Sequence, residues 1–353
     1  MNSSPLADFL GQLAVASGQA SILALVVWGV CRLLGDHLAA RWRCQLWLLV
    51  VVRLALPVSL PSPVSLFNLI GAPVRLASPD AVPFWLPEEL AGQFFRGLEL
   101  PWVGWIWTTV TGVLLLRVVA SWLMTVWIRA TARPTDSWEA WLLLQECKEV
   151  SGLDVPVAIL ESSRVRTPCL LGFLRPRLIL PLGLRAELSK DELRLIFLHE
   201  LAHLRRRDLA MNWLLAAVEI VHWFNPLAWM VTRRMREDRE EACDACALDV
   251  RPESNREYAM TLLKLIERGS PGIDSGASAG PTPTLAVGVL GTAEEDITPL
   301  VHRIRAISRH RPHGRTWVVG FCTWLALVCV GLTDAEPRPV SEVPGVAAAE
   351  HSS

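Results

Sequence analysis

Four long apolar runs constrain this chain more than any other feature of its sequence; they occupy residues 13–34, 44–60, 101–128 and 317–332. Each approaches or exceeds the roughly 17–25 residues that an α-helix needs to cross a bilayer. Tryptophans gather near several of their ends, as in the aromatic belts of membrane interfaces; these are Trp42, Trp47, Trp102, Trp105, Trp127 and Trp317. The runs predict four transmembrane helices.

The arginines between these runs predict an orientation. They concentrate between the first and second runs, after the third, and before the fourth, where Arg303, Arg305, Arg309, Arg311 and Arg315 lie. The positive-inside rule then places the N-terminus and the C-terminal tail outside and the region between the third and fourth runs inside. In a bacterial inner membrane protein, inside is the cytoplasm. Arg53 and Arg117 lie within apolar runs, and the sequence assigns them no role.

The chain of 353 residues is long enough for a catalytic domain in addition to these helices. We expect a membrane region at 1–128 with three transmembrane helices, a cytoplasmic domain at 129–315, the fourth helix at 316–332, and a disordered tail at 333–353. The cytoplasmic domain should be α+β, because a strand at 155–160 and a hairpin of 169–174 with 178–181 accompany its helices. A net charge of −1 gives no sign of a nucleic-acid partner.

The stretch His199-Glu200-Leu201-Ala202-His203 carries the chemistry of the cytoplasmic domain. Residues four apart share one face of a helix, so both imidazoles can reach one metal ion. A helix is expected here because Ser189 and Glu192 form a capping-box pattern that would start it. Two histidines and a carboxylate suit zinc with a fourth position left open, and Glu200 is then placed to act as a general base.

The best candidate for the third ligand is Glu240, with Glu241 and Glu219 as rivals. Asp244 lies four residues after Glu240 and could accept the N–H of a ligating histidine, which would fix the tautomer of its ring. This spacing is the arrangement of the glutamate-type zincins. The alternative is a solvated charged face, because residues 236–241 form a run of charges. Asp208 is a second candidate to orient a histidine, here His203.

The apolar stretch 209–231 directly follows the predicted zinc helix. Its polar residues argue against a fifth transmembrane helix, and we expect a buried or membrane-abutting helix that ends near Asn225-Pro226. His222 within it is either a buried histidine with satisfied hydrogen bonds or a donor to the transition state. Cys243 and Cys246 form a C-x-x-C pattern, for which packing is a simpler explanation than redox chemistry.

Four motifs together resemble the BlaR/MecR-type membrane metallopeptidases. They are PCLLGFLRPRLILP at 168–181, LHELAHLRRRD at 198–208, WFNP at 223–226 and DREEACD at 238–244. The resemblance implies zinc ligands at His199, His203 and Glu240, a catalytic base at Glu200, and a cytosolic zincin domain held between transmembrane helices. Family members of known role cut themselves and a DNA-binding repressor. They also carry a large penicillin-binding domain after the last transmembrane helix, whereas residues 333–353 lack an S-x-x-K acylation pattern. A β-lactam trigger within this chain is therefore not expected, and sensing would use residues 61–100, the transmembrane helices or a partner.

The predicted fold is a mainly α membrane protein with an inserted glutamate-type zincin domain, and the predicted function is that of a zinc endopeptidase. The alternative is a non-catalytic membrane signalling scaffold with a structural zinc site. Expected partners are Zn²⁺, the lipid bilayer, a protein substrate such as a winged-helix DNA-binding repressor, and a second copy of the chain in a homodimer, without direct binding of nucleic acid. Residues 269–292 are rich in Gly, Ser, Pro and Thr and are a candidate site of self-cleavage.

Overall fold

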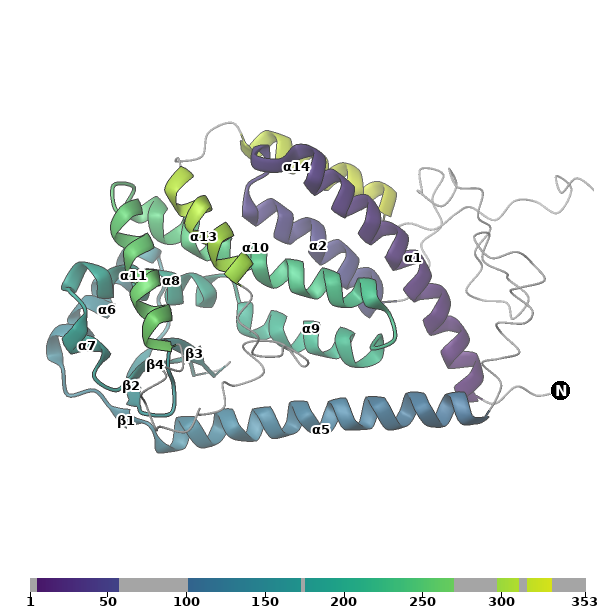
Figure 1. Ribbon diagram of the computed structural model, residues 1–353, viewed down its shortest axis with the longest axis horizontal. Coiled ribbons are helices and arrows are strands. Elements are labelled where there is room, and N and C mark those ends of the chain that lie inside the picture. Colours follow the sequence, from purple (N-terminus) through teal and green to yellow (C-terminus); the bar gives the residue numbers. More distant parts are fainter. Residues whose placement is uncertain (1–4, 57–100, 173–174, 270–296, 311–315, 332–353) are drawn as a thin grey trace, which may run out of the picture. The chain divides into compact units, whose positions relative to one another are not determined.

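The computed structural model describes residues 5–56, 101–172, 175–269, 297–310 and 316–331. These residues are mainly helical and divide into two compact units (Figure 1). The first unit takes its described residues from 5–56, 101–112, 221–232 and 316–331, and the second takes the remainder. The predicted sensing segment 61–100, the self-cleavage segment 269–292 apart from Gly269, and the tail 333–353 lie outside the described residues.

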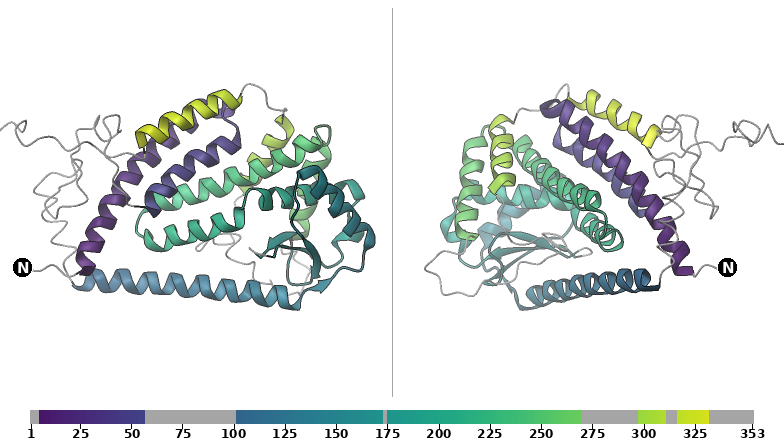
Figure 2. Two further views of the ribbon diagram at one scale, coloured as in Figure 1. Left: turned by 180° about the vertical axis from the view of Figure 1, so that it is seen from behind. Right: turned by 45° about the vertical axis from the view of Figure 1, so that its right-hand side comes forward.

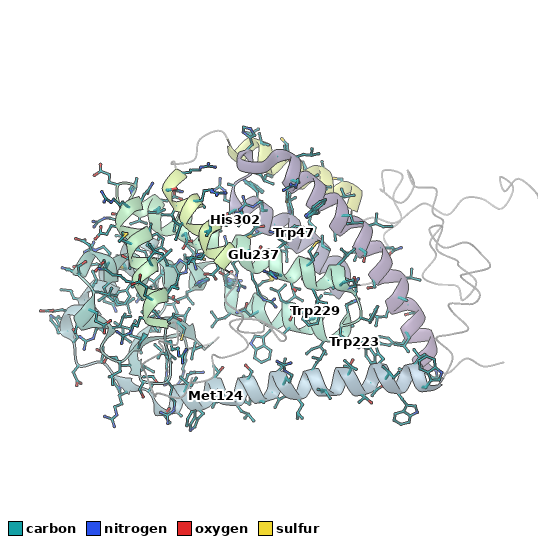
Figure 3. All side chains as sticks on the ribbon, in the orientation of Figure 1. Trp47, Met124, Trp223, Trp229, Glu237 and His302 are labelled. Carbon is teal, nitrogen blue, oxygen red and sulfur yellow. The ribbon has the colours of Figure 1, made fainter. Side chains whose placement is uncertain are left out.

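The first unit is a layer of helices in which α1 packs against α2, and α2 packs against α14. Figure 2 shows these helices side by side from two directions. Trp47 of α2, labelled in Figure 3, is almost completely buried. Trp42 meets Phe321 of α14 edge to face, with ring centroids 6.1 Å apart. The bounds of the helices are Pro5–Leu34 for α1, Ala40–Ala55 for α2, Pro101–Thr131 for α5 and Thr316–Gly331 for α14, and a short 3-10 turn, η1, occupies Gly35–His37.

The described residues contain two helices long and apolar enough to cross a membrane, at Phe9–Leu34 and Trp102–Thr131, so the prediction of four is corrected. The second predicted run forms α2, which has 16 residues and is roughly 24 Å long. It stops at Ala55 because Pro57 follows, and the residue before a proline is driven out of the helical region; Leu56 is indeed extended, with φ −124° and ψ 93°. The fourth run forms α14, also of 16 residues.

Gly320 is a point of close contact between α14 and α2. A Cβ atom built on Gly320 would clash with the indole ring of Trp42, whose own side chain has little room to move beside Phe321. We therefore expect Gly320→Ala to lower the stability of the protein by about 1–3 kcal/mol, the usual cost of overpacking. Thermal unfolding in detergent would measure the loss. Gly29→Ala is the matched control, because nothing lies within 4 Å of a Cβ there, and a melting temperature equal for both variants would contradict the prediction.

The second unit is built on a four-stranded mixed sheet of order β1-β2-β4-β3. Strands β1 and β2 are antiparallel, β2 and β4 are parallel, and β3 and β4 are antiparallel. The predicted hairpin is confirmed, since β3 pairs with β4 across the turn that contains Arg175 and Pro176. The strand predicted at 155–160 lies slightly later, as β2. The bounds are Arg133–Pro134 for β1, Ala158–Ser162 for β2, Cys169–Leu171 for β3 and Arg177–Pro181 for β4.

Helices α6, α8 and α10 share one apolar core with the sheet. Phe197, Leu198 and Leu201 of α8 pack with Leu144 of α6 and with Leu178 of β4, all of them buried. α8 also lies against β3, so this core fixes α8 at one edge of the sheet. The helices are α6 at Trp138–Ser151, α7 at Leu184–Glu187, α8 at Lys190–Arg205, α9 at Asp208–Val221, α10 at Pro226–Val250, α11 at Asn255–Gly269 and α13 at Ile297–Arg309.

The stretch 209–231 is divided between α9, a turn, and the start of α10. Asn225 caps α10, because its side-chain oxygen accepts hydrogen bonds from the backbone N–H groups of Leu227 and Ala228. Pro226 occupies the first helical position, where its missing N–H costs nothing. The residues of α10 up to 232 belong to the first unit, and those from 233 onward belong to the second.

Candidate metal centre

Helix α8 carries the H-E-x-x-H residues, and its start is defined by a capping box. Ser189 accepts a hydrogen bond from the backbone N–H of Glu192, and the Glu192 carboxylate accepts one from the backbone N–H of Ser189. This reciprocal pair satisfies two N–H groups that a helix start would otherwise leave without partners. The helix then runs without interruption to Arg205, which places His199 and His203 one turn apart on the same face.

The two histidines meet Glu240 of α10. Nε2 of His199 lies 3.6 Å from one carboxylate oxygen of Glu240, and Nε2 of His203 lies 3.7 Å from the other. One ligand atom from each of these three residues lies within 4.8 Å of the other two. The two imidazole rings are nearly perpendicular, at 88°, with centroids 4.9 Å apart. The structure thus brings together the three residues predicted as ligands.

These distances fit a zinc ion. Two ligand atoms at about 2.0–2.2 Å from one tetrahedral centre are separated by roughly 3.4 Å. The Nε2–Oε separations of 3.6 and 3.7 Å need only a small adjustment to reach that value. Two imidazoles and one carboxylate are also the donor set of a catalytic zinc site, which keeps its fourth position open, whereas structural sites use four protein ligands. Among the described residues, the cluster supplies three.

The far side of His199 is held by a carboxylate and a phenol. Its Nδ1 lies 2.9 Å from Oδ1 of Asp244 and 2.9 Å from the hydroxyl of Tyr258. The Tyr258 hydroxyl in turn donates to Asp244 at 2.7 Å. A proton on Nδ1 that points at these acceptors leaves Nε2 free to bind a metal, and it also fixes the plane of the ring. Asp244 therefore lies where the spacing of α10 predicted it.

His203 is oriented in the same way by Asp208, whose Oδ2 lies 2.8 Å from Nδ1. The chain turns back between α8 and α9 at Arg207, which adopts a left-handed conformation with φ 58°. This turn allows Asp208 to reach a histidine only five positions earlier. The thiol of Cys243 lies 3.3 Å from the same Nδ1 atom and contributes to the packing of this pair. Neither Cys243 nor Cys246 forms a disulfide.

Glu200 lies beside the ligands and is buried, with 9% of its surface exposed. Burial raises the pKa of this carboxyl above its ordinary value, and the positive charge of the neighbouring histidines limits the rise. A carboxyl with a raised pKa is better suited to exchange protons near neutral pH than an ordinary surface glutamate. Its location and protonation behaviour match those required of a general base.

The carboxylates of Glu240 and Asp244 are held as anions. Burial alone would raise the pKa of Glu240, but His203, His199 and Arg303 hold it well below its usual range. Burial opposes ionisation of Asp244 too, yet Arg303 keeps its pKa far below normal. Burial lowers the pKa of His199, while Asp244 and Glu240 raise it to about 10. A bound metal has to displace that proton, so we expect metal uptake to release protons.

The other residues considered as ligands or donors have different surroundings. Glu219 is fully buried and binds Arg236 at 2.5 Å. Glu241 does not converge with other candidate metal ligands among the described residues. His222 belongs to the first unit, where Nδ1 lies 3.3 Å from the Ser17 hydroxyl and Nε2 lies 3.1 Å from the Leu54 carbonyl. Its two ring nitrogens therefore have partners within that unit.

Two residues of this cluster escaped the sequence analysis, Tyr258 of α11 and Arg303 of α13. Tyr258 is the single tyrosine of the chain, which is the only sequence signal that could have singled it out. Arg303 was counted among the basic residues that orient the membrane helices. Neither has a fixed spacing to the H-E-x-x-H residues, and both reach the cluster through tertiary packing.

Comparisons with known proteins show the family of the chain. The profile of a peptidase family described as BlaR1 peptidase M56 matches residues 11–281. The chain is 32% identical over 143 residues to the regulatory protein BlaR1 of Bacillus licheniformis, which covers 40% of this chain and 24% of that protein. It is 31% identical over 110 residues to the methicillin resistance mecR1 protein of Staphylococcus aureus, which covers 31% and 19%. The matched part thus spans a quarter or less of these relatives. Because the family profile covers most of the chain and includes His199, His203 and Glu240, this protein belongs to the BlaR1 peptidase M56 family.

Proposed function

We propose that this chain is a membrane-anchored, zinc-dependent endopeptidase with a regulatory role. The observation that carries the proposal is the convergence of His199, His203 and Glu240, with Glu200 buried beside them and the outer nitrogen of each imidazole held by a carboxylate. A structural zinc site has no need of the buried Glu200, so the arrangement favours an enzyme over a non-catalytic scaffold.

His199, His203 and Glu240 would hold the zinc ion, which would supply Lewis-acid chemistry to the scissile carbonyl and to water. Glu200 removes a proton from the attacking water while the water oxygen bonds to the carbonyl carbon. The same carboxyl then delivers that proton to the amide nitrogen as the C–N bond breaks, which yields a carboxylic acid and an amine. Asp244 and Asp208 keep the two imidazoles in the orientation that binding requires.

Strand β3 supports a mode of substrate binding. In the sheet order it occupies one edge among the described strands, and it packs against α8. Glu200 lies on α8, the helix against which β3 packs. An extended peptide that adds to this edge would run past the metal centre, as in β-augmentation.

The substrate is, in this proposal, a cytosolic regulatory protein such as a winged-helix DNA-binding repressor, and the chain itself is a second substrate. The names of the relatives, a regulatory protein and a resistance protein, support a regulatory role. The two apolar helices support insertion in a bacterial inner membrane. The arginines that follow α5 and precede α14 support a cytoplasmic location for the peptidase unit. A homodimer is part of the same proposal.

Metal removal tests the proposed function. We expect the detergent-purified protein to contain about one zinc ion per chain and to cleave casein or itself. A zinc chelator should abolish cleavage, and added zinc should restore it. The measurements are elemental analysis and mass spectrometry of the fragments. Cleavage that persists with zinc removed would contradict the proposal, as would full zinc content with no cleavage of casein, of the chain itself or of a co-expressed repressor.

A further inference from the structure

Arg303 inserts its guanidinium group into the candidate metal centre from α13. Its Nε donates to Oδ2 of Asp244 at 2.9 Å, and its Nη2 donates to Oδ1 at 2.8 Å. Its third nitrogen, Nη1, lies 3.4 Å from Oε2 of Glu240. One arginine therefore engages both oxygens of the carboxylate that orients His199, and it also reaches a candidate metal ligand. The fork of an arginine is suited to such two-point contact.

The position of Arg303 is built into the core of the second unit. Ile307 lies four residues later on α13, on the same face, and is 1% exposed. It packs with Tyr258 of α11, Leu195 of α8 and Leu248 of α10. The same apolar cluster therefore holds α13, the tyrosine that contacts His199, and the two helices that carry the ligands.

The charges of the cluster show what Arg303 contributes. Asp244 is 2% exposed at its side chain, and an unpaired charge at that depth is costly. Arg303 supplies the opposing charge through contacts with both oxygens of Asp244. Without Arg303, Asp244 would lose the partner that fixes its two oxygens.

We propose that Arg303 is a positioning residue of the metal centre. It acts through Asp244 and Glu240: it holds Asp244 against Nδ1 of His199 and holds one oxygen of Glu240 at the edge of the metal pocket. The inference rests on the proposed function, because it requires that His199, His203 and Glu240 bind zinc. The proposal makes α13 a functional part of the site, although α13 begins well after Glu240, the last candidate ligand in the chain.

The test is the zinc affinity of Arg303→Gln, measured by competition with a chromophoric chelator in the full-length detergent-solubilised protein. We expect the affinity to fall about 10- to 100-fold, as for other partners of metal-ligating side chains. The absorption spectrum of the cobalt-substituted protein should change as well, because the ligand field depends on the orientation of His199 and Glu240. Arg305→Gln is the matched control, since Arg305 lies on the same helix and is exposed. Equal affinities and spectra for wild type and Arg303→Gln would overturn the proposal, and so would an equal loss in the control.

Two further variants keep the test decisive if Arg303→Gln folds poorly. Arg303→Lys retains the charge without the fork, and we expect its zinc affinity to lie between those of the glutamine variant and the wild type. In the Asp244→Asn background, Arg303→Gln should have a smaller effect than it has alone, because the buried charge that Arg303 pairs is already removed. Equal effects in both backgrounds would overturn the link through Asp244. A wild-type protein that binds no zinc would instead refute the proposed function.

Discussion

Replacement of Glu200 by glutamine is expected to lower the rate of peptide cleavage by about 10²–10⁴-fold, the usual contribution of a general base. The amide has nearly the same shape as the carboxylate, so it should fill the same buried position, but it cannot take a proton from water. Zinc content should be unchanged, because Glu200 is not among the three residues whose ligand atoms converge. The measurements are single-turnover cleavage and elemental analysis of the same preparation.

Glu237→Gln is the matched control for this prediction. Glu237, labelled in Figure 3, lies on α10 and forms surface ion pairs with Arg233 at 3.0 Å and Arg234 at 3.1 Å. Such pairs contribute little to stability, so cleavage should proceed at the wild-type rate. If the Glu200 variant and the control gave the same fragments at the same rate, Glu200 would not be the base and the proposed mechanism would fail.

Replacement of Glu240 by glutamine is expected to have the largest effect on metal binding, with zinc affinity reduced by more than about 100-fold, beyond the loss typical of residues that only orient a ligand. The two carboxylate oxygens face the two Nε2 atoms at 3.6 and 3.7 Å. A neutral amide offers one weak oxygen donor in place of an anion, and zinc binds carboxylate oxygen far better. Chelator competition and elemental analysis would give the change.

Glu241→Gln separates the two adjacent glutamates of α10. Successive residues on a helix point about 100° apart, and Glu241 does not belong to the convergent group. Its replacement should therefore leave the zinc affinity unchanged. Full affinity in the Glu240 variant, or a comparable loss in both, would mean that the third ligand is wrongly assigned and that the peptidase proposal has lost its metal centre.

The part of the site that could be predicted from the sequence is the part governed by helix periodicity. His199 and His203 share a face because they are four apart, and Asp244 follows Glu240 by the same interval. Ser189 and Glu192 form the capping box that their spacing predicts. In each case the rule concerns spacing within one helix, so it can be applied without the tertiary fold. The contact of Asp244 with His199 joins α10 to α8 and depends on how these helices pack.

Arg303 and Tyr258 could not be predicted in this way. Their contacts with Asp244 and His199 arise because α11 and α13 pack together and against the ligand-bearing helices. Arg303 also precedes an apolar run, where the positive-inside rule accounts for a basic residue. The sequence therefore offers no reason to look for a second role of Arg303. Packing decides between the two roles, and packing depends on apolar contacts distant in sequence.

The end of the second predicted membrane helix, unlike the contacts of Arg303, follows from a local feature of the sequence. The run at 44–60 contains Pro57, and the conformation of Leu56 shows that the helix ends where the rule for residues before proline predicts. Apolar composition alone predicts one helix over residues 44–60, although Pro57 interrupts that run. Pro57 therefore predicts the end of α2 at Ala55, which the length of the apolar run does not.

The candidate ligands precede residue 270 and Arg303 follows residue 296, so the site draws on both sides of the self-cleavage segment predicted from composition. Cleavage of the backbone in that segment would yield two polypeptides. One would carry the candidate zinc ligands, and the other would carry Arg303, the counterion of Asp244. The two would then be held together by non-covalent contacts, those of Ile307 in its apolar cluster and those of α14 with α2. Loss of the fragment that carries Arg303 would leave Asp244 without its counterion, so we expect cleavage in this segment to weaken zinc binding and limit further cleavage.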